Sequence, residues 1–154
     1  MHIVPAVLLL LHLLAAAWWV GGMAVMHFAV RPAAVAVLPP PLRLPFMAAA
    51  LGRFFVGVSL AIVLLLVSGF AMIVQAGGMR QVHWSVHAML TLGLVMVLVY
   101  GHIRFGVYPK LQRAVAAADW PAAGGRLHLI RLLVTGNLVL GMAVFALAVV
   151  GRAF

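Results

Sequence analysis

Four long apolar segments constrain the fold of this 154-residue chain more than any other feature. Residues 1–30, 54–79, 81–103 and 132–151 contain no lysine, arginine, aspartate or glutamate, and each segment has at least 20 residues. A helix of about 20 residues, rising about 1.5 Å per residue, crosses the hydrocarbon core of a bilayer. The runs are continuous and lack the alternation of a β-barrel strand. The sequence therefore predicts an all-α membrane protein, a four-transmembrane-helix bundle that forms one integral membrane domain over residues 1–154.

Prolines, glycines and charges set the expected boundaries of the spans. Pro39, Pro40 and Pro41 prevent one continuous helix over residues 31–45, which are expected to form a short surface excursion. Gly77 and Gly78 predict a tight turn, and Asp119 before Trp120-Pro121 predicts a helix N-cap. The predicted spans are 4–30, 46–76, 83–107 and 126–151, and residues 108–125 are expected to be an amphipathic cytoplasmic connection.

The basic residues predict the orientation of the chain. The formal net charge is +9, from ten basic residues and one acidic residue. Eight of the basic residues lie in the two longer connections (Arg31, Arg43, Arg53, Arg104, Lys110, Arg113, Arg126 and Arg131), whereas only Arg80 and Arg152 lie at the other ends of the spans. The positive-inside rule then places these connections in the cytoplasm and both termini outside, in a bacterial inner (plasma) membrane. Because loop charges of this kind contact anionic lipid, the bilayer is the expected partner and nucleic acid is not.

Missing residue types exclude several chemistries. The chain has no cysteine, which excludes disulfides, iron–sulfur clusters and thiolate metal sites. No span contains an acidic residue, so a carboxylate proton relay or a hard-cation site is not expected within the membrane.

Histidines inside the predicted spans form two equally spaced pairs. His12 and His27 are 15 residues apart in the first span, and His87 and His102 are 15 residues apart in the third. This spacing gives about 22 Å of rise and about 60° of rotation, so each pair lies near one helix face. The two spans run in the same direction, and His12 is therefore expected to be level with His87, and His27 with His102.

Two stacked histidine pairs are the framework of a di-haem b site. Neutral imidazole is a good iron ligand, and helix bundles hold haem between side chains of facing helices. Gly22 and Gly93 would leave helix surface free for the flat macrocycle, and Arg31 and Arg104 would bind haem propionates near the membrane edge. His83, one turn before His87, is an alternate outer ligand. Because two histidine ligands exclude substrate from the iron, this arrangement favours electron transfer, with a quinone or a protein as redox partner.

The same residues are also compatible with a structural role or with copper binding. Intramembrane histidines and Asn137 can simply form interhelical hydrogen bonds, and Gly21-Gly22 can mark close helix packing. Nine methionines together with His2, His83 and His87 could handle Cu(I), for which Met79 or Met72 would supply sulfur. A structural or partner subunit without a cofactor is the third hypothesis, and a homo-oligomer is compatible with all three.

The first predicted span resembles that of the copper-resistance D (CopD) superfamily. His12, Trp19, Gly22 and the Arg31-Pro32 exit carry this resemblance. It continues with Arg53-Phe54, with Ser68-Gly69, and with the stretch from His102 to Asp119-Trp120-Pro121, which is similar to that of small four-span members. The resemblance implies a membrane helix bundle with a haem or metal site.

The chain is also similar to the HemJ-type membrane protoporphyrinogen oxidases, which are thought to bind haem b. The shared features are the His, Trp and Gly spacing of the first span, a late histidine in the third span at His102, and an arginine–asparagine element at Arg131 and Asn137. That group has a lysine early in the third span, where this chain has His87. It also has an acidic residue after the asparagine, which this chain lacks.

Overall fold

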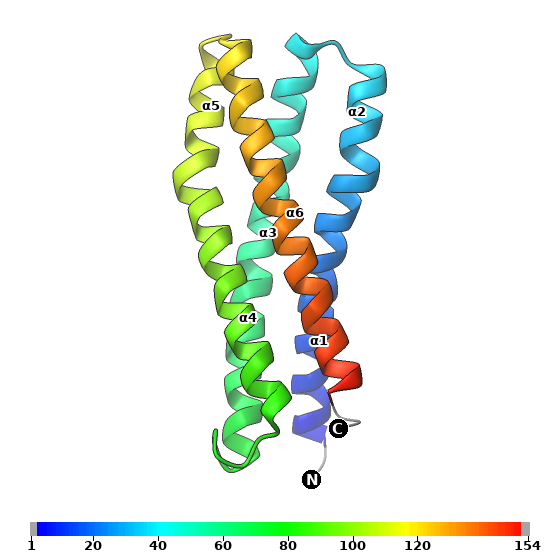
Figure 1. The fold of residues 1–154 in the computed structure, drawn as a ribbon, viewed down its shortest axis with the longest axis vertical. Helices are drawn as coiled ribbons and strands as arrows, with labels where there is room; N and C mark the ends of the chain where they lie inside the picture. Colours follow the sequence, from blue (N-terminus) through cyan, green and yellow to red (C-terminus); the bar gives the residue numbers. More distant parts are fainter. Residues whose placement is uncertain (1–2, 152–154) are drawn as a thin grey trace.

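The computed structural model describes residues 3–151, which form an all-α fold of antiparallel helices (Figure 1). In chain order the elements are α1 (Ile3–Val25), the π-helical segment η1 (Met26–Val30), α2 (Arg31–Val37), α3 (Pro40–Gln75), α4 (Trp84–Gly101), the π-helical segment η2 (His102–Val107), α5 (Tyr108–Ala116) and α6 (Trp120–Val150). No strand occurs within these described residues. The predicted all-α fold class is confirmed.

Consecutive elements join into four helices that are long and apolar enough to cross a membrane. They are Ile3–Val37, Pro40–Gln75, Trp84–Ala116 and Trp120–Val150, with 35, 36, 33 and 31 residues. At about 1.5 Å per residue each exceeds the roughly 30 Å of a hydrocarbon core, so the helix ends extend beyond it. The expected break within residues 31–45 is confirmed, because Leu38 and Pro39 separate α2 from α3, but the non-helical excursion is only these two residues long.

Pro32 and Pro109 each follow a π-helical segment, and this explains why the helices continue through these two prolines, whereas Pro45 lies within the first turns of α3 without one. The N–H of Arg31 donates to the carbonyl of Met26, and the N–H of Tyr108 donates to that of Ile103, both five residues back. Pro32 and Pro109 come next, without an N–H and with a ring that would press on the carbonyl four residues earlier in a regular α-helix. The wider π turn relieves this clash and keeps the backbone bonded.

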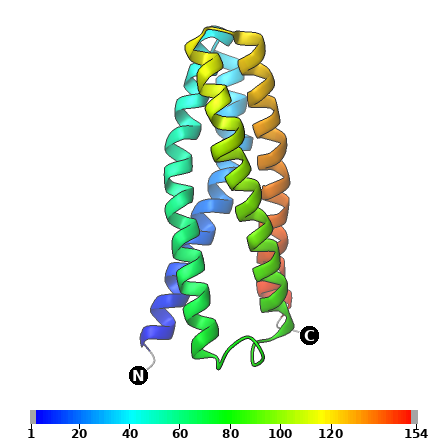
Figure 2. The same cartoon turned by 90° about the vertical axis from the view of Figure 1, so that its left-hand side faces the viewer.

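The helices pack as two close pairs. The α1 and α3 helices pack along their length, as do α4 and α6, while α6 also contacts α1 and α3 (Figures 1 and 2). The beginning of α1 and the end of α6 lie at one end of the bundle with the α3–α4 turn, and the α2–α3 and α5–α6 turns lie at the other (Figure 1). We call the second end the basic end, because it carries Arg31, Arg43, Arg113 and Arg126.

Four aromatic side chains join the two pairs in the middle of the bundle. Trp19, Phe55, Tyr100 and Tyr108 are at most 7% exposed, and their rings meet edge to face with centroids 5.2–6.2 Å apart. The Tyr100 hydroxyl donates to the carbonyl of Phe55 at 2.8 Å, and the Tyr108 hydroxyl donates to that of Ala48 at 2.9 Å. Trp19 and Tyr100 thus fill the space between the first and third spans.

Two local predictions about turns are confirmed. Gly77 and Gly78 have φ of +91° and +96°, which L-residues with side chains adopt rarely, and they reverse the chain after α3. The Asp119 carboxylate accepts a hydrogen bond from the Ala122 N–H at 3.0 Å and caps α6.

Two glycines of α6 allow a matched test of the packing. A methyl group at Gly141 would lie 2.7 Å from Val20 and 3.3 Å from Met96, whereas one at Gly136 would meet no atom within 4 Å. We expect Gly141→Ala to lower the free energy of unfolding by about 1–3 kcal/mol through overpacking. Gly136→Ala should be neutral or stabilising by up to about 1 kcal/mol. Thermal unfolding in detergent, followed by circular dichroism, measures both; equal effects would contradict this packing.

Candidate functional site

The two histidines of the first span lie on the buried face of α1 and η1. His12 shares its helix face with Ala15 and Trp19, both buried. Its Nδ1 lies 2.9 Å from the Ser68 hydroxyl on α3. His27 follows the buried Met23 by one turn, and its Nδ1 lies 3.2 Å from the Thr135 hydroxyl on α6. Both imidazoles are half-buried between helices.

The histidines of the third span lie on the opposite, exposed side of their helix. The buried stripe of α4 contains Met96 and Tyr100. His87 precedes Met96 by nine residues and lies about 180° from it, and His102 follows Tyr100 by two residues, about 200° away. Both side chains are exposed. The structure therefore does not bring His87 to His12 or His102 to His27, because equal spacing within two helices does not determine which faces meet.

Other predicted site residues have local structural contacts. His83 is the N-cap of α4, and its Nδ1 lies 3.0 Å from the Ser85 hydroxyl. Gly22 is covered by the Phe54 ring of α3, as expected for close helix packing, whereas Gly93 has open space beside it. The Arg104 guanidinium lies over the Tyr108 ring, 5.6 Å from its centroid. His2 and Arg152 lie outside the described residues.

We assign the tautomers of the first-span histidines from their hydroxyl partners, each of which also lies next to a carbonyl of its own helix. Thr135 Oγ1 donates its single proton to the Arg131 carbonyl at 2.8 Å, so toward His27 it can only accept. Ser68 likewise donates to the Leu64 carbonyl and accepts from His12. With the hydroxyl protons so placed, each imidazole in its neutral form would carry hydrogen on Nδ1 and leave the lone pair of Nε2 free. A metal-binding histidine needs this arrangement, in which the second ring nitrogen is held by a partner.

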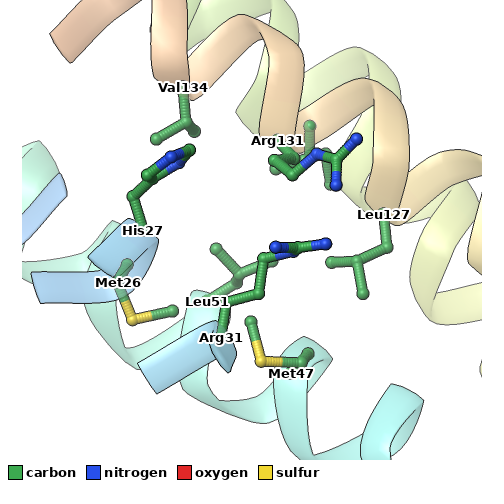
Figure 3. A pocket seen from close by; sticks show the side chains of 9 residues that line it. Met26, His27, Arg31, Met47, Leu51, Leu127, Arg131 and Val134 are labelled. Carbon is green, nitrogen blue, oxygen red and sulfur yellow. The ribbon is translucent and has the colours of Figure 1, made fainter. Parts of the chain in front are cut away.

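A small cavity lies beside His27, between the first, second and fourth spans (Figure 3). Its volume is about 40 Å³. The residues that line it are Met26, His27, Arg31, Met47, Leu51, Leu127, Ile130, Arg131 and Val134. A single water occupies at least 10–15 Å³, whereas pockets for drug-sized molecules have roughly 300–1,000 Å³. The cavity therefore fits an ion or a few waters, and a haem would require the helices to move apart.

The cavity has a soft-donor side and a cationic side. Met26, Met47 and His27 offer two thioether sulfurs and one imidazole nitrogen around the hollow (Figure 3). Arg31 and Arg131 also line it, and their guanidinium groups turn to the same side, away from His27 (Figure 3). Within residues 3–151, no three side chains of histidine, cysteine, aspartate or glutamate gather into a metal-binding group. The polar or sulfur-containing side chains of the lining are thus two thioethers, one imidazole and two guanidinium groups.

The sequence does not single out Met47 or Thr135 as functional residues. Both belong to other helices than His27, and no spacing rule links them to it. The proline signal of Arg31-Pro32 is the nearest available clue, because π-helical segments such as η1, which holds His27, occur frequently at functional sites.

Asn137 forms the interhelical hydrogen bond expected of it. Its Nδ2 donates to the Met96 carbonyl of α4 at 3.1 Å, and the side chain is 2% exposed. Its Oδ1 has no hydrogen-bond partner among residues 3–151. The bond joins α4 and α6 in the middle of the bundle.

Comparisons with known proteins identify one family. The family model described as CopD, copper resistance protein D, matches residues 48–151. No curated protein and no solved structure matches the chain.

The protonation of the first-span histidines can be measured directly. We expect ¹⁵N NMR of histidine-labelled protein in micelles to show the Nδ1–H tautomer for His12 and His27 at neutral pH, because each hydroxyl can only accept. Thr135→Val should remove this preference at His27 and leave His12 unchanged, and Ser68→Ala should do the reverse. An Nε2–H tautomer at both sites in the unsubstituted protein would contradict the assignment.

Proposed function

The chain belongs to the copper resistance protein D family, whose model matches more than half of it, and we propose that it binds Cu(I) as cargo in the cavity lined by Met26, His27 and Met47. One observation carries the proposal: two thioethers and an imidazole line a hollow of ionic size. The four apolar helices and the family together make it an integral membrane protein.

The donor set matches Cu(I) better than other biological cations. Thioether sulfur is a soft ligand that selects Cu(I), and imidazole suits copper as well. Mg²⁺ and Ca²⁺ require oxygen ligands, which this cavity does not offer from its lining side chains. Thr135 would hold the His27 ring in place through Nδ1 while Nε2 ligates the ion.

The two arginines make the site weak for a bare cation. A unit positive charge about 5 Å from a guanidinium is destabilised by about 3 kcal/mol at an effective dielectric constant of about 20. Arg31 and Arg131 both line the cavity, so their repulsion offsets part of the ligand bonds. This suits transient handling of copper rather than storage, because a weakly held ion is released quickly.

The charge distribution supports an orientation for this handling. We propose that the basic end faces the cytoplasm of a bacterial inner membrane, with both termini outside, following the positive-inside rule. The Cu(I) cavity lies nearer this end, since its lining comes from the end of the first span and the beginnings of the second and fourth.

Haem b binding by His12, His27, His87 and His102 stays a prediction. The histidines of each expected pair do not face each other, and Trp19 and Tyr100 occupy the space between the first and third spans. A visible spectrum of purified protein separates the two readings, because bound haem has strong absorption bands and Cu(I) is colourless.

Titration of Cu(I) against a Cu(I)-specific chelator tests the proposal. Purified protein in detergent with reductant should bind one Cu(I) per chain. We expect the double variant Met26→Leu/Met47→Leu to bind at least about tenfold more weakly, because it keeps the apolar volume and removes both sulfur donors.

Met142→Leu is the matched control. Met142 lies on α6 with 62% exposure and does not line the cavity, so its loss should leave Cu(I) affinity unchanged. The proposal is overturned if unsubstituted protein binds no Cu(I), if the double variant binds as tightly, or if Met142→Leu loses as much affinity.

A further inference from the structure

A larger pocket adjoins the cavity at the basic end of the bundle. Its volume is about 180 Å³, and it lies between α2, α3 and α6. Its lining residues are Arg31, Val35, Arg43, Leu44, Met47, Gly124, Leu127, His128 and Arg131. Arg31, Met47, Leu127 and Arg131 line both hollows.

The pocket gathers positive charge that the chain does not neutralise. Arg31, Arg43 and Arg131 are all half-buried, so solvent screens them less than it screens exposed side chains. The sequence has one acidic residue, Asp119, and its carboxylate accepts the Ala122 N–H at the start of α6. Three guanidinium groups in one partly buried pocket repel each other, and a bound anion would relieve this repulsion.

His128 positions one of these guanidinium groups. Its Nδ1 lies 2.7 Å from Arg131 Nη2, and since a guanidinium can only donate, Nδ1 accepts. The imidazole then keeps its hydrogen on Nε2 and adds no charge to the pocket. The charged groups of the lining are all guanidinium groups, which are donors, as an anion requires.

The other half of the lining is apolar. Val35, Leu44 and Leu127 supply aliphatic surface beside the guanidinium groups. The pocket lies where three membrane-length helices end, which is the level of lipid headgroups in a bilayer. A ligand that fits both halves is anionic at one end and apolar at the other.

We infer that the pocket formed by Arg31, Arg43 and Arg131 binds a phosphate group, carried by the headgroup of an anionic phospholipid. Guanidinium groups bind phosphate oxygens in bidentate fashion, and three of them match the several oxygens of one phosphate. The aliphatic lining receives the glycerol and the first methylenes of the acyl chains. This inference does not require copper binding.

Lipid retention measured by native mass spectrometry in detergent tests the inference. The probes are phosphatidylglycerol, which is anionic, and phosphatidylcholine, which is zwitterionic. We expect one phosphatidylglycerol per chain, retained at least tenfold more tightly than phosphatidylcholine, with Arg43→Gln losing about tenfold of that affinity. Arg113→Gln, an exposed arginine at the same end but outside the pocket, should change it less than twofold.

A second variant fills the pocket without changing charge. Gly124 lines it and has open space beside its Cα, so Gly124→Leu should fold and should displace the lipid. Met26→Leu should leave lipid binding unchanged, so the copper and lipid proposals fail separately. Equal losses in Arg43→Gln and Arg113→Gln, or full retention in Gly124→Leu, would overturn the inference. So would displacement of the lipid by millimolar inorganic phosphate alone, because free phosphate would then be the ligand.

Discussion

Backbone hydrogen bonding in the absence of water governs this structure. Inside a hydrocarbon core, an N–H or C=O without a protein partner costs several kcal/mol, so the chain must satisfy these groups itself. The π-helical segments do this where prolines would interrupt a regular helix. The Tyr100 and Tyr108 hydroxyls bond carbonyls of α3, and Ser68 and Thr135 bond carbonyls of their own helices. These carbonyls lie inside helices and already accept backbone N–H bonds, so the added bonds satisfy the hydroxyls; Ser68 and Thr135, with their protons directed there, can accept from His12 and His27.

Composition was enough to predict the fold, but not the faces that its helices present to one another. Four uncharged runs of at least 20 residues have few alternatives to membrane helices, and the turns at Gly77-Gly78 and Asp119 follow from local preferences. The helix ends were harder: the break expected at Pro39–Pro41 occurs at Leu38 and Pro39, but the helices on either side extend further than predicted, and a π-helical segment lets the first one continue through Pro32. The histidine pairs depended on which face of α4 is buried. Met96 and Tyr100 mark the buried face of α4, and Asn137 of α6 bonds the Met96 carbonyl there. These contacts join different helices, and spacing within one helix does not predict them.

The two hollows at the basic end would, under the two proposals, hold ligands of opposite charge. Sulfur and imidazole donors surround the smaller hollow, and guanidinium groups dominate the larger one, with Arg31 and Arg131 at their boundary. An anion held by these arginines would lower the repulsion that a cation meets next to them. Copper and phosphate binding are then coupled through charge, and either ligand would strengthen binding of the other by the same factor.

Each wide turn and its proline form a linked pair in the backbone. Removing one residue from Met26–Val30 would return the turn to α-helical geometry and place the ring of Pro32 against the carbonyl four residues before it. Replacing Pro32 alone would supply an N–H and remove the reason for the wide turn. Single-residue insertions or deletions here should therefore accumulate together with changes at position 32. The same holds for His102–Val107 and Pro109. Among related sequences, the length of each of these segments and the presence of its proline should therefore change together.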